Sequence, residues 1–215
     1  FKLHPDYDLI LNEILSRNPS ARLVLLQGRR GTWTEMVSRR MEAAMSKDAF
    51  RRVHFTPRVG SSNDYMRLLQ KADVVLHPFP FGGSKTSADA IALGLPLVTK
   101  PTSALRGRMA YSYFVTMGVF DTVAESDEQY VDIAVRLGND PAWRREVSRK
   151  VKEKSHLIFQ RSTVVTAWSL FFLRAHRLAQ GDDDAPPARS FGGDLPKPNQ
   201  GFTRPPANAH EEVPP

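Results

Sequence analysis

The sequence predicts an α/β fold in which helices cover both faces of a parallel β-sheet. Short, almost wholly apolar segments alternate with longer segments whose apolar residues recur at helical spacing. Strands that are apolar throughout are typical of a parallel sheet that is buried on both faces. The chain has 215 residues, of which 41% are hydrophobic, so it is long and apolar enough to bury the core of one domain.

The first predicted elements are a helix, a strand and a second helix. The first helix begins at Pro5 and ends before Pro19, because proline cannot continue a helix. The apolar run at residues 22–27 is typical of a buried strand. Either Thr32 or Thr34 can cap the next helix, whose apolar residues recur at helical spacing.

The alternation of strands and helices continues through the middle of the chain. Residues 52–56 and 72–76 are predicted strands, and residues 63–71 form a short amphipathic helix between them. The helix that follows the second of these strands is capped by Ser84 or Thr86.

Helices dominate the last third of the predicted domain. Gly94 closes the preceding helix as a C-terminal glycine, and residues 95–99 supply a further strand. Four helices are then expected over residues 108–117, 127–137, 141–158 and 162–178. We expect the aromatic residues of the last helix, around Trp168, to pack either on this domain or on a lobe outside this chain.

The composition changes at Gly181. Residues 181–215 contain half of the chain's 16 prolines and few apolar residues. Such a segment cannot bury enough apolar surface to offset the entropy lost on ordering. We therefore expect one domain over residues 1–180 and a disordered tail over residues 181–215. Because the first residue is Phe1 and not a methionine, we interpret the chain as a fragment of a longer protein.

The composition also excludes several classes of function. There is no cysteine, which excludes disulfides, zinc–thiolate sites and a catalytic thiol, and which fits a reducing compartment. No apolar run reaches the roughly 18 residues that a membrane span requires. Residues 1–5 lack the hydrophobic run of a signal peptide, so we expect none. The spacing of His4, His54 and His77 does not suit a metal ion, so we expect no metal site.

The formal net charge of +7 favours an anionic partner, either a nucleic acid or a nucleoside diphosphate. Paired arginines occur at residues 29–30, 39–40, 51–52 and 144–145. A nucleic-acid site would require these pairs to converge with exposed aromatic residues, and their spacing does not indicate this. We therefore interpret them as solvated, with nucleic-acid binding as the weaker alternative.

Residues 78–89 carry the strongest signal for a binding site. They follow a buried strand and open a helix, which is where an open α/β sheet binds ligands. Gly82 and Gly83 let the backbone approach a ligand, and the N–H groups of Ser84, Lys85 and Thr86 at a helix N-terminus suit a diphosphate. Asp89, about one turn later, can accept hydrogen bonds from ribose hydroxyls. The alternative is an ordinary helix cap after a tight turn, with Asp89 favoured by the helix dipole.

Four segments around this loop resemble the donor-site signature of the O-GlcNAc transferase and SPINDLY glycosyltransferases. They are residues 72–76, residues 78–86, Asp89 and residues 94–99. The resemblance continues through Arg108, Ser112 and Gly118 to the helix at residues 128–140, and residues 1–5 resemble the family's lysine-containing segment. In total it covers about residues 1–159.

The resemblance implies a Rossmann-like domain, the C-terminal lobe of a GT-B glycosyltransferase. It places Lys2 at the family's pyrophosphate-binding lysine, with a catalytic role in stabilising the leaving group, and Ser84, Lys85 and Thr86 on the phosphate-binding turn. It places Asp89 at the ribose-binding acid and Tyr65 at the position of a histidine that packs beside the nucleotide. Two further departures are Ser84-Lys85 in place of a His-Thr or Thr-Thr pair, and His77 where the family often has aspartate.

The function implied is the donor-binding lobe of an inverting protein O-glycosyltransferase. The donor would be a nucleoside-diphosphate sugar, UDP-GlcNAc or GDP-fucose, and the acceptor a Ser or Thr hydroxyl of a protein or peptide. We expect this protein in the cytoplasm, the nucleus or both. No metal or other cofactor is expected. Its own N-terminal lobe and tetratricopeptide repeats would lie outside this chain, so the fragment alone would not turn over. The alternative is a degenerate, non-catalytic module for nucleotide binding or scaffolding, which Tyr65 and Ser84 favour.

Overall fold

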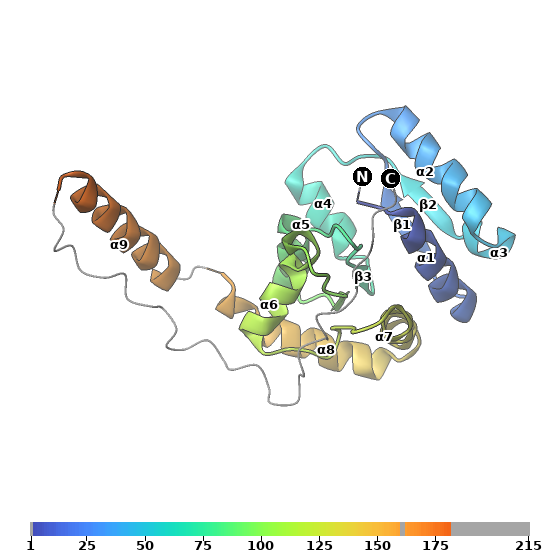
Figure 1. Ribbon diagram of the computed structural model, residues 1–215. Coiled ribbons are helices and arrows are strands. Elements are labelled where there is room, and N and C mark those ends of the chain that lie inside the picture. Colours follow the sequence, from blue (N-terminus) through green and yellow to red (C-terminus); the bar gives the residue numbers. More distant parts are fainter. Residues whose placement is uncertain (1, 160–161, 182–215) are drawn as a thin grey trace.

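The computed structural model describes residues 2–159 and 162–181 and contains two parallel two-stranded sheets (Figure 1). In the first sheet, β1 (Leu23–Leu26) pairs with β2 (Val53–Thr56), with Leu23 opposite Val53. In the second, β3 (Val75–Leu76) pairs with β4 (Leu97–Val98), and a parallel bridge joins Thr99 to Val123. The predicted parallel α/β fold is confirmed, although its strands form two sheets.

The first half of the chain contains four helices among the described residues, three of them close to predicted positions and one, α3, not predicted. They are α1 (Pro5–Arg17), α2 (Gly31–Ala44), the four-residue α3 (Lys47–Phe50) and α4 (Ser62–Leu69). The predicted cap of α2 is wrong, because Arg30 occupies the N-cap position. The hydroxyl of Thr34 instead accepts a hydrogen bond from the N–H of Gly28, at 2.8 Å, and so closes the loop after β1.

The second half contains α5 (Lys85–Ala92), α6 (Met109–Met117), α7 (Asp127–Asn139), α8 (Pro141–Lys154) and α9 (Ser162–Ala179). Short 3₁₀ helices cover Leu105–Gly107 and Ser155–Leu157. The predicted C-terminal glycine of α5 is confirmed, since Gly94 has φ of 71°. The N–H groups of Gly94 and Leu95 donate to Ile91 and Ala90, which is the Schellman arrangement.

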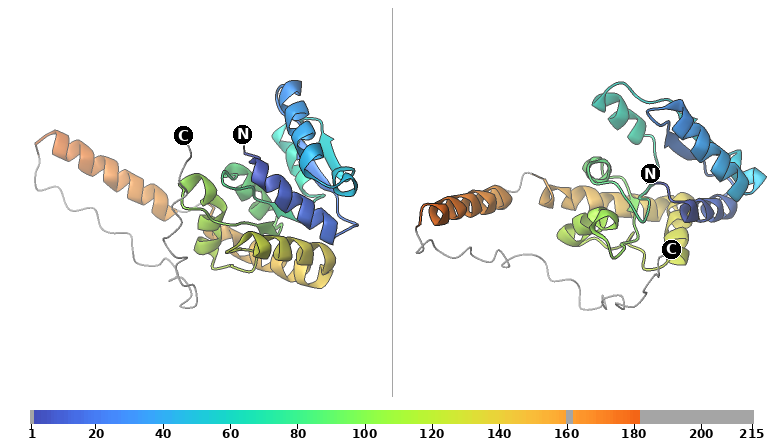
Figure 2. Two further views of the ribbon diagram at one scale, coloured as in Figure 1. Left: turned by 45° about the vertical axis from the view of Figure 1, so that its right-hand side comes forward. Right: turned by 45° about the horizontal axis from the view of Figure 1, so that its top comes forward.

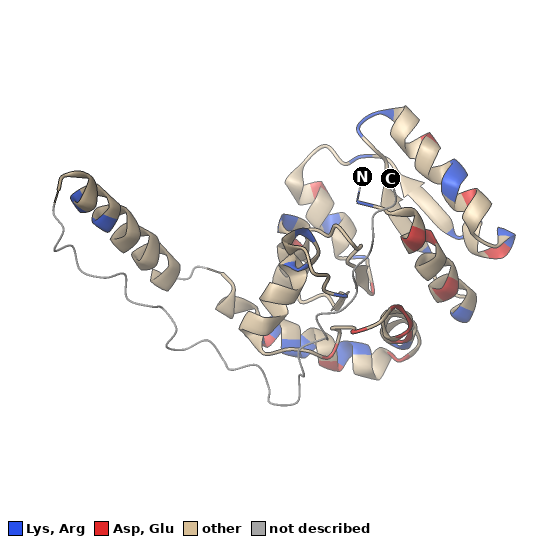
Figure 3. Ribbon diagram, viewed as in Figure 1, with Lys and Arg blue, Asp and Glu red and all other residues tan. Residues whose placement is uncertain are grey.

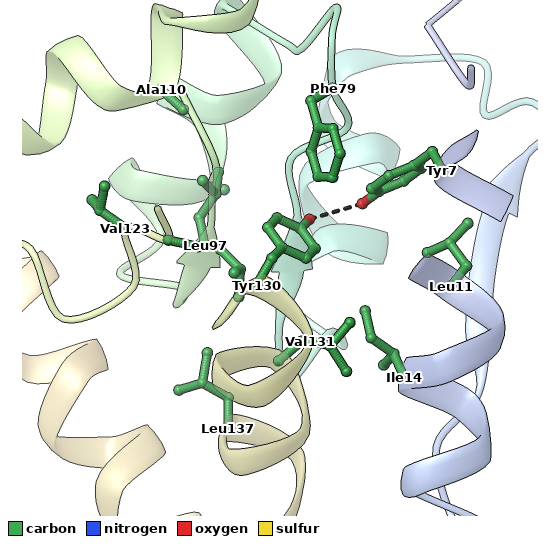
Figure 4. Close-up of a cluster of buried hydrophobic side chains, with 14 of the residues drawn as sticks. Tyr7, Leu11, Ile14, Phe79, Leu97, Ala110, Val123, Tyr130, Val131 and Leu137 are labelled. Atoms are coloured by element: carbon green, nitrogen blue, oxygen red, sulfur yellow. Dashed lines mark hydrogen bonds between the residues drawn. The ribbon is translucent and has the colours of Figure 1, made fainter. Parts of the chain in front are cut away.

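Three buried aromatic rings hold the centre of the core (Figure 4). Tyr7 of α1, Phe79 of the loop after β3, and Tyr130 of α7 meet edge to face, with ring centroids 5.0 to 6.1 Å apart. The Tyr130 hydroxyl donates to the carbonyl of His77 at 3.2 Å, and the two tyrosine hydroxyls lie 2.8 Å apart. Because each hydroxyl has one proton, Tyr7 donates to Tyr130.

Helix α1 connects the two halves of the fold (Figure 1). It contacts α2 and α3 on one side and α7 on the other. The Asp8 carboxylate of α1 is fully buried and receives two hydrogen bonds from Arg40 of α2, at 2.7 and 3.0 Å. Arg40 also donates to the carbonyl of Leu3 at 3.0 Å, so one guanidinium fixes both the helix and the N-terminal segment.

Helix α9 lies apart from the other helices in every view (Figure 1, Figure 2). Its side chains Val165, Trp168 and Phe172 are 66%, 57% and 61% exposed, and Trp168 stacks on Phe172 with centroids 5.6 Å apart. The expected packing of this helix on the domain is therefore wrong, and packing on a lobe outside this chain stays a prediction. None of the described helices is long and apolar enough to cross a membrane. The predicted tail lies outside the described residues, apart from Gly181.

Candidate functional site

An open groove of about 290 Å³ lies between the carboxyl ends of β1 and β2 and the start of α5. Its walls are formed by Leu26, Arg58, Val59, Ser61, Ser62, Tyr65, Lys85, Thr86 and Asp89. Four of the predicted site residues, Tyr65, Lys85, Thr86 and Asp89, therefore share one groove. Its position at the carboxyl ends of parallel strands is where open α/β sheets bind ligands.

The turn before α5 is tightly packed against His77. A Cβ added to Gly82 would lie 1.8 Å from Cε1 of the His77 ring, and one added to Gly83 would lie 2.1 Å from the Thr86 hydroxyl. The Gly83 carbonyl accepts hydrogen bonds from His77 Nε2 at 3.1 Å and from the Ser87 hydroxyl at 2.9 Å. The two glycines are thus required by close packing within the protein, whereas the sequence suggested only the approach of a ligand.

Backbone N–H groups at this turn are available to an anion. Within residues 2–159 and 162–181, the N–H groups of Ser84, Lys85 and Thr86 donate to no protein acceptor. These groups open α5, an eight-residue helix whose dipole adds partial positive charge at the same place. The Ser84 side chain does not cap the helix as expected, because its hydroxyl lies 3.2 Å from the hydroxyl of Tyr113.

Lys85 and Asp89 form an ion pair across one turn of α5. The Lys85 ammonium lies 3.0 and 2.9 Å from the two carboxylate oxygens of Asp89. The Lys85 side chain is 80% exposed and that of Asp89 18% exposed, so the lysine can move while the carboxylate stays in the groove wall. A surface pair of this kind contributes at most about 0.5 kcal/mol, which an anionic ligand can readily replace.

Tyr65 of α4 stands half-buried in the groove opposite Asp89. Burial raises the pKa of its hydroxyl above the ordinary value, and the Asp89 charge adds to the rise. The hydroxyl is therefore protonated at neutral pH and can donate a hydrogen bond. The ring offers a flat apolar face to a planar group.

Lys2 lies beside the same turn but does not line the groove. A bridge between Leu3 and Pro80 holds the N-terminal segment against the loop after β3. The Lys2 ammonium lies 5.2 Å from the centroid of the Phe81 ring, and its charge contributes to lowering the pKa of His77. The structure thus places Lys2 beside Phe81, in the loop that leads to the start of α5.

His77 is 2% exposed, and burial is the main cause of a pKa lowered from 6.5 to about 4. A carbonyl oxygen can only accept, so Nε2 must carry the proton that bonds Gly83. The other nitrogen, Nδ1, then accepts from the Thr99 hydroxyl at 3.2 Å. The His77 ring therefore packs within the protein, with both nitrogens bonded to protein groups.

Sequence reasoning missed the loop between β2 and α4, which forms one wall of the groove with Arg58, Ser61 and Ser62. This loop follows the carboxyl end of a strand next to β1, so the rule that located residues 78–89 could also have identified it. Arg58 adds a second exposed cation to the groove. Across the part of the chain that the structure describes, no cluster of acidic and histidine side chains could hold a metal ion.

Basic and acidic residues lie close together along several of the described helices. Figure 3 shows Lys and Arg interspersed with Asp and Glu along α1, α2 and α8. Several of the paired arginines form ion pairs with a neighbouring acid, including Arg39 with Glu35 and Arg144 with Asp73. The interpretation of the arginine pairs as solvated holds for Arg39 and Arg51, whose side chains are 76% and 75% exposed. It is wrong for Arg40, Arg52 and Arg144, which are 32%, 16% and 23% exposed because they bond partly or fully buried oxygens of the protein.

Three curated relatives are all much longer than this chain, which spans 14%, 7% and 16% of their lengths. A probable UDP-N-acetylglucosamine–peptide N-acetylglucosaminyltransferase SPINDLY from Hordeum vulgare is 26% identical over 62% of this chain. A UDP-N-acetylglucosamine–peptide N-acetylglucosaminyltransferase from Caenorhabditis elegans is 39% identical over 38% of it. A UDP-glucose:protein N-beta-glucosyltransferase from Actinobacillus pleuropneumoniae is 30% identical over 44% of it.

Among solved structures, a mutant O-GlcNAc transferase from Thermobaculum terrenum superposes with a TM-score of 0.68. The two sequences are 22% identical, and the match covers 86% of this chain and 34% of that chain. The likeness confirms the fold that the resemblance implied. The family model described as glycosyl transferase family 41 matches residues 1–165, more than three quarters of the sequence. The chain therefore belongs to glycosyl transferase family 41.

Proposed function

We propose that this chain is the donor-binding lobe of an inverting protein O-glycosyltransferase. The observation that carries the proposal is the single groove shared by Tyr65, Lys85, Thr86 and Asp89 at the start of α5. Two cationic side chains, Lys85 and Arg58, line it, and the N–H groups of Lys85 and Thr86 have no acceptor within the described residues, which suits a nucleoside diphosphate.

Each groove residue has a distinct role in the proposal. The diphosphate binds the α5 N-terminus and displaces Asp89 from Lys85, whose ammonium then neutralises phosphate charge. The freed carboxylate of Asp89 accepts hydrogen bonds from ribose hydroxyls, and the Tyr65 ring packs against the base. As the bond to the sugar breaks, negative charge develops on the leaving diphosphate, and Lys85, Arg58 and the helix dipole stabilise it without a metal ion.

We assign Lys2 the catalytic role of a further cation for the leaving diphosphate. It lies beside the phosphate-binding turn, and the bridge between Leu3 and Pro80 limits its movement. The names of the three relatives pair a UDP-sugar donor with a peptide or protein acceptor, which favours the same classes here. Transfer to a Ser or Thr hydroxyl requires an acceptor-binding lobe, so residues 1–215 alone are expected to bind donor weakly without turnover.

A second candidate function is a non-catalytic nucleotide-binding or scaffold module. Two observations favour it: the Ser84 hydroxyl is engaged by Tyr113, and Lys85 is paired with Asp89. Both groups would have to leave a protein partner before they could bind a ligand. This module would bind nucleotide but would transfer no sugar.

Calorimetric titration of the full-length protein with UDP, GDP and ADP tests donor binding. We expect selective binding of UDP or GDP, and about tenfold weaker binding in Lys85→Ala and Asp89→Ala, since each loses a charge-assisted contact. Arg149→Ala is the matched control, because it removes an ion pair with Glu153 at the same helical spacing on α8. Unchanged affinity in both groove variants would contradict the assigned site.

Sugar transfer to an acceptor peptide separates the two candidate functions. An active transferase should lose turnover in Lys2→Met while the affinity for the nucleotide diphosphate changes less. Nucleotide binding without any transfer from UDP-GlcNAc, UDP-glucose or GDP-fucose would support the non-catalytic module. No binding of any nucleotide by the full-length protein would exclude both.

A further inference from the structure

We infer that His77 is a positioning residue for the diphosphate site: it fixes the peptide between Gly83 and Ser84 so that the Ser84 N–H points outward. The inference rests on the proposed function, because it concerns the N–H groups that would bind phosphate. His77 would not touch the donor. It would act through the shape of the turn.

His77 is held by hydrogen bonds at all four of its polar groups. Its N–H donates to the carbonyl of Val98 at 2.9 Å, and its carbonyl accepts from Tyr130 at 3.2 Å. Its ring nitrogens bond Thr99 and Gly83, as described above. A side chain that is anchored by β4 and α7 and almost wholly buried provides a fixed reference point for the turn.

The orientation of the turn follows from the geometry of one peptide. In a trans peptide the C=O and the next N–H point in opposite directions, and the cis peptide found in the structure lies elsewhere, between Phe79 and Pro80. The Gly83 carbonyl points inward, to His77 and Ser87. The Ser84 N–H therefore points outward, beside those of Lys85 and Thr86.

Close packing makes this arrangement sensitive to the ring of His77. The Gly82 backbone lies so near the ring that any Cβ there would overlap it. The N–H of Gly82 also donates to the carbonyl of Arg106 at 3.0 Å, which holds the turn from its other side. Rotation of the Gly83–Ser84 peptide would break the bond to His77 and leave a buried nitrogen donor without a partner, which is costly.

The protonation state of His77 is also fixed by its surroundings. The positive charge of Lys2 and the burial of the ring both disfavour the imidazolium. The hydroxyls of Tyr130 and Tyr7 lie on the side of the main-chain carbonyl of His77. Both are protonated at neutral pH, because burial raises the pKa of each. At neutral pH the ring therefore has one donor, directed at Gly83, and one acceptor, directed at Thr99.

Two amide substitutions separate the two ring contacts. In His77→Gln the amide nitrogen can take the place of Nε2 and keep the bond to Gly83. In His77→Asn the shorter side chain can replace only Nδ1, so it reaches Thr99 and leaves Gly83. Both variants place an uncharged amide in the same buried site. Any effect of the amide itself is therefore common to both, and a difference between them reports the contact with Gly83.

The affinity for nucleoside diphosphates, relative to the parent nucleosides, reports the inferred role. In the full-length protein we expect His77→Asn to weaken binding of UDP or GDP about tenfold, with the affinity for uridine or guanosine unchanged within about twofold. His77→Gln should bind both as the wild type does. Equal losses for nucleoside and diphosphate, or unchanged diphosphate affinity in His77→Asn, would overturn the inference.

Amide hydrogen exchange tests the turn independently of any nucleotide. The N–H groups of Gly82 and Ser87 are the protected ones to follow, because they donate to the carbonyls of Arg106 and Ser84. We expect their exchange to accelerate about tenfold in His77→Asn and not in His77→Gln, since only the first releases the Gly83 carbonyl. If the wild-type protein binds no nucleotide, the proposed function fails and this measurement still decides the role of His77. Equal exchange in the two variants would show that His77 does not hold the turn.

Discussion

His77 is 2% exposed and has a pKa of about 4, whereas the ordinary value of a histidine is 6.5. Between pH 4 and pH 6.5, His77 is therefore protonated in the unfolded chain and neutral in the folded protein. The stability that this residue contributes is therefore complete above pH 6.5 and is lost as the pH falls towards 4. The difference between the two pKa values corresponds to about 3 kcal/mol in the free energy of unfolding.

We expect the wild-type protein to lose about 2 to 3 kcal/mol more than His77→Gln between pH 7 and pH 4, because glutamine does not titrate. Urea unfolding at several pH values measures the free energy of unfolding of both proteins. Carboxylates titrate equally in both, so the difference isolates the histidine. Parallel pH profiles would show that His77 is not buried in its neutral form.

The sequence indicated four of the nine residues that line the groove, but neither the loop after β2 nor what supports the turn before α5. Lys85, Thr86 and Asp89 were predictable because they lie at the start of one helix, directly after a buried strand. The ion pair of Lys85 with Asp89 also follows from their spacing. The role of His77 was not predictable, because its partners Thr99 and Tyr130 are brought to it by tertiary packing and carry no local pattern.

Among the secondary-structure elements, periodicity located the long helices and the apolar strands. It missed α3, because four residues are too few to show a helical repeat. Residue type suggested Thr34 as a possible N-cap of α2, whereas its hydroxyl closes the loop after β1 by accepting a hydrogen bond from Gly28. The division of the strands into two sheets had no signal in the sequence, since pairing depends on segments that lie far apart.

Helix α9 provides a test at the scale of one element. Phe172 is 61% exposed, whereas Phe114 of α6 is fully buried. We expect Phe172→Ser to change the free energy of unfolding of the 215-residue chain by less than about 0.5 kcal/mol. Phe114→Ala should cost about 3 to 5 kcal/mol, because it leaves a cavity in the core.

Thermal or urea unfolding of the two variants and the wild type provides the comparison. A large loss of stability in Phe172→Ser would mean that α9 packs on the domain in solution. The same substitution in the full-length protein tests whether another lobe covers this face. If Phe172 is buried there, Phe172→Ser should lower the free energy of unfolding by about 1 kcal/mol or more, the contribution of one buried side chain.

For the whole molecule, the pairing of Asp8 with Arg40 couples the sheet of β1 and β2 to the rest of the fold through α1. We expect Arg40→Met to lower the free energy of unfolding by about 3 kcal/mol, because it leaves a fully buried carboxylate without its partner. Hydrogen exchange should accelerate more in β1 and β2 than in β3 and β4, since α1 would no longer hold α2.

Arg39→Met is the matched control for this prediction. Arg39 is the neighbouring residue on α2, and its 76% exposed side chain pairs with Glu35 on the surface. Its replacement should change the stability by less than about 0.5 kcal/mol. Equal effects of the two substitutions, or equal exchange in both sheets, would show that α1 does not couple the halves through this pair.

Both described strand pairs are parallel, so each joins segments that helices separate along the chain: Leu23 with Val53, and Val75 with Leu97. The chain must close these long loops before the first strand hydrogen bonds form, and the lost entropy slows that step. Helices such as α1 and α8 need only local contacts and form earlier. During refolding, helical signal should therefore precede the burial of the apolar strands, and aggregation should compete with folding mainly in that interval.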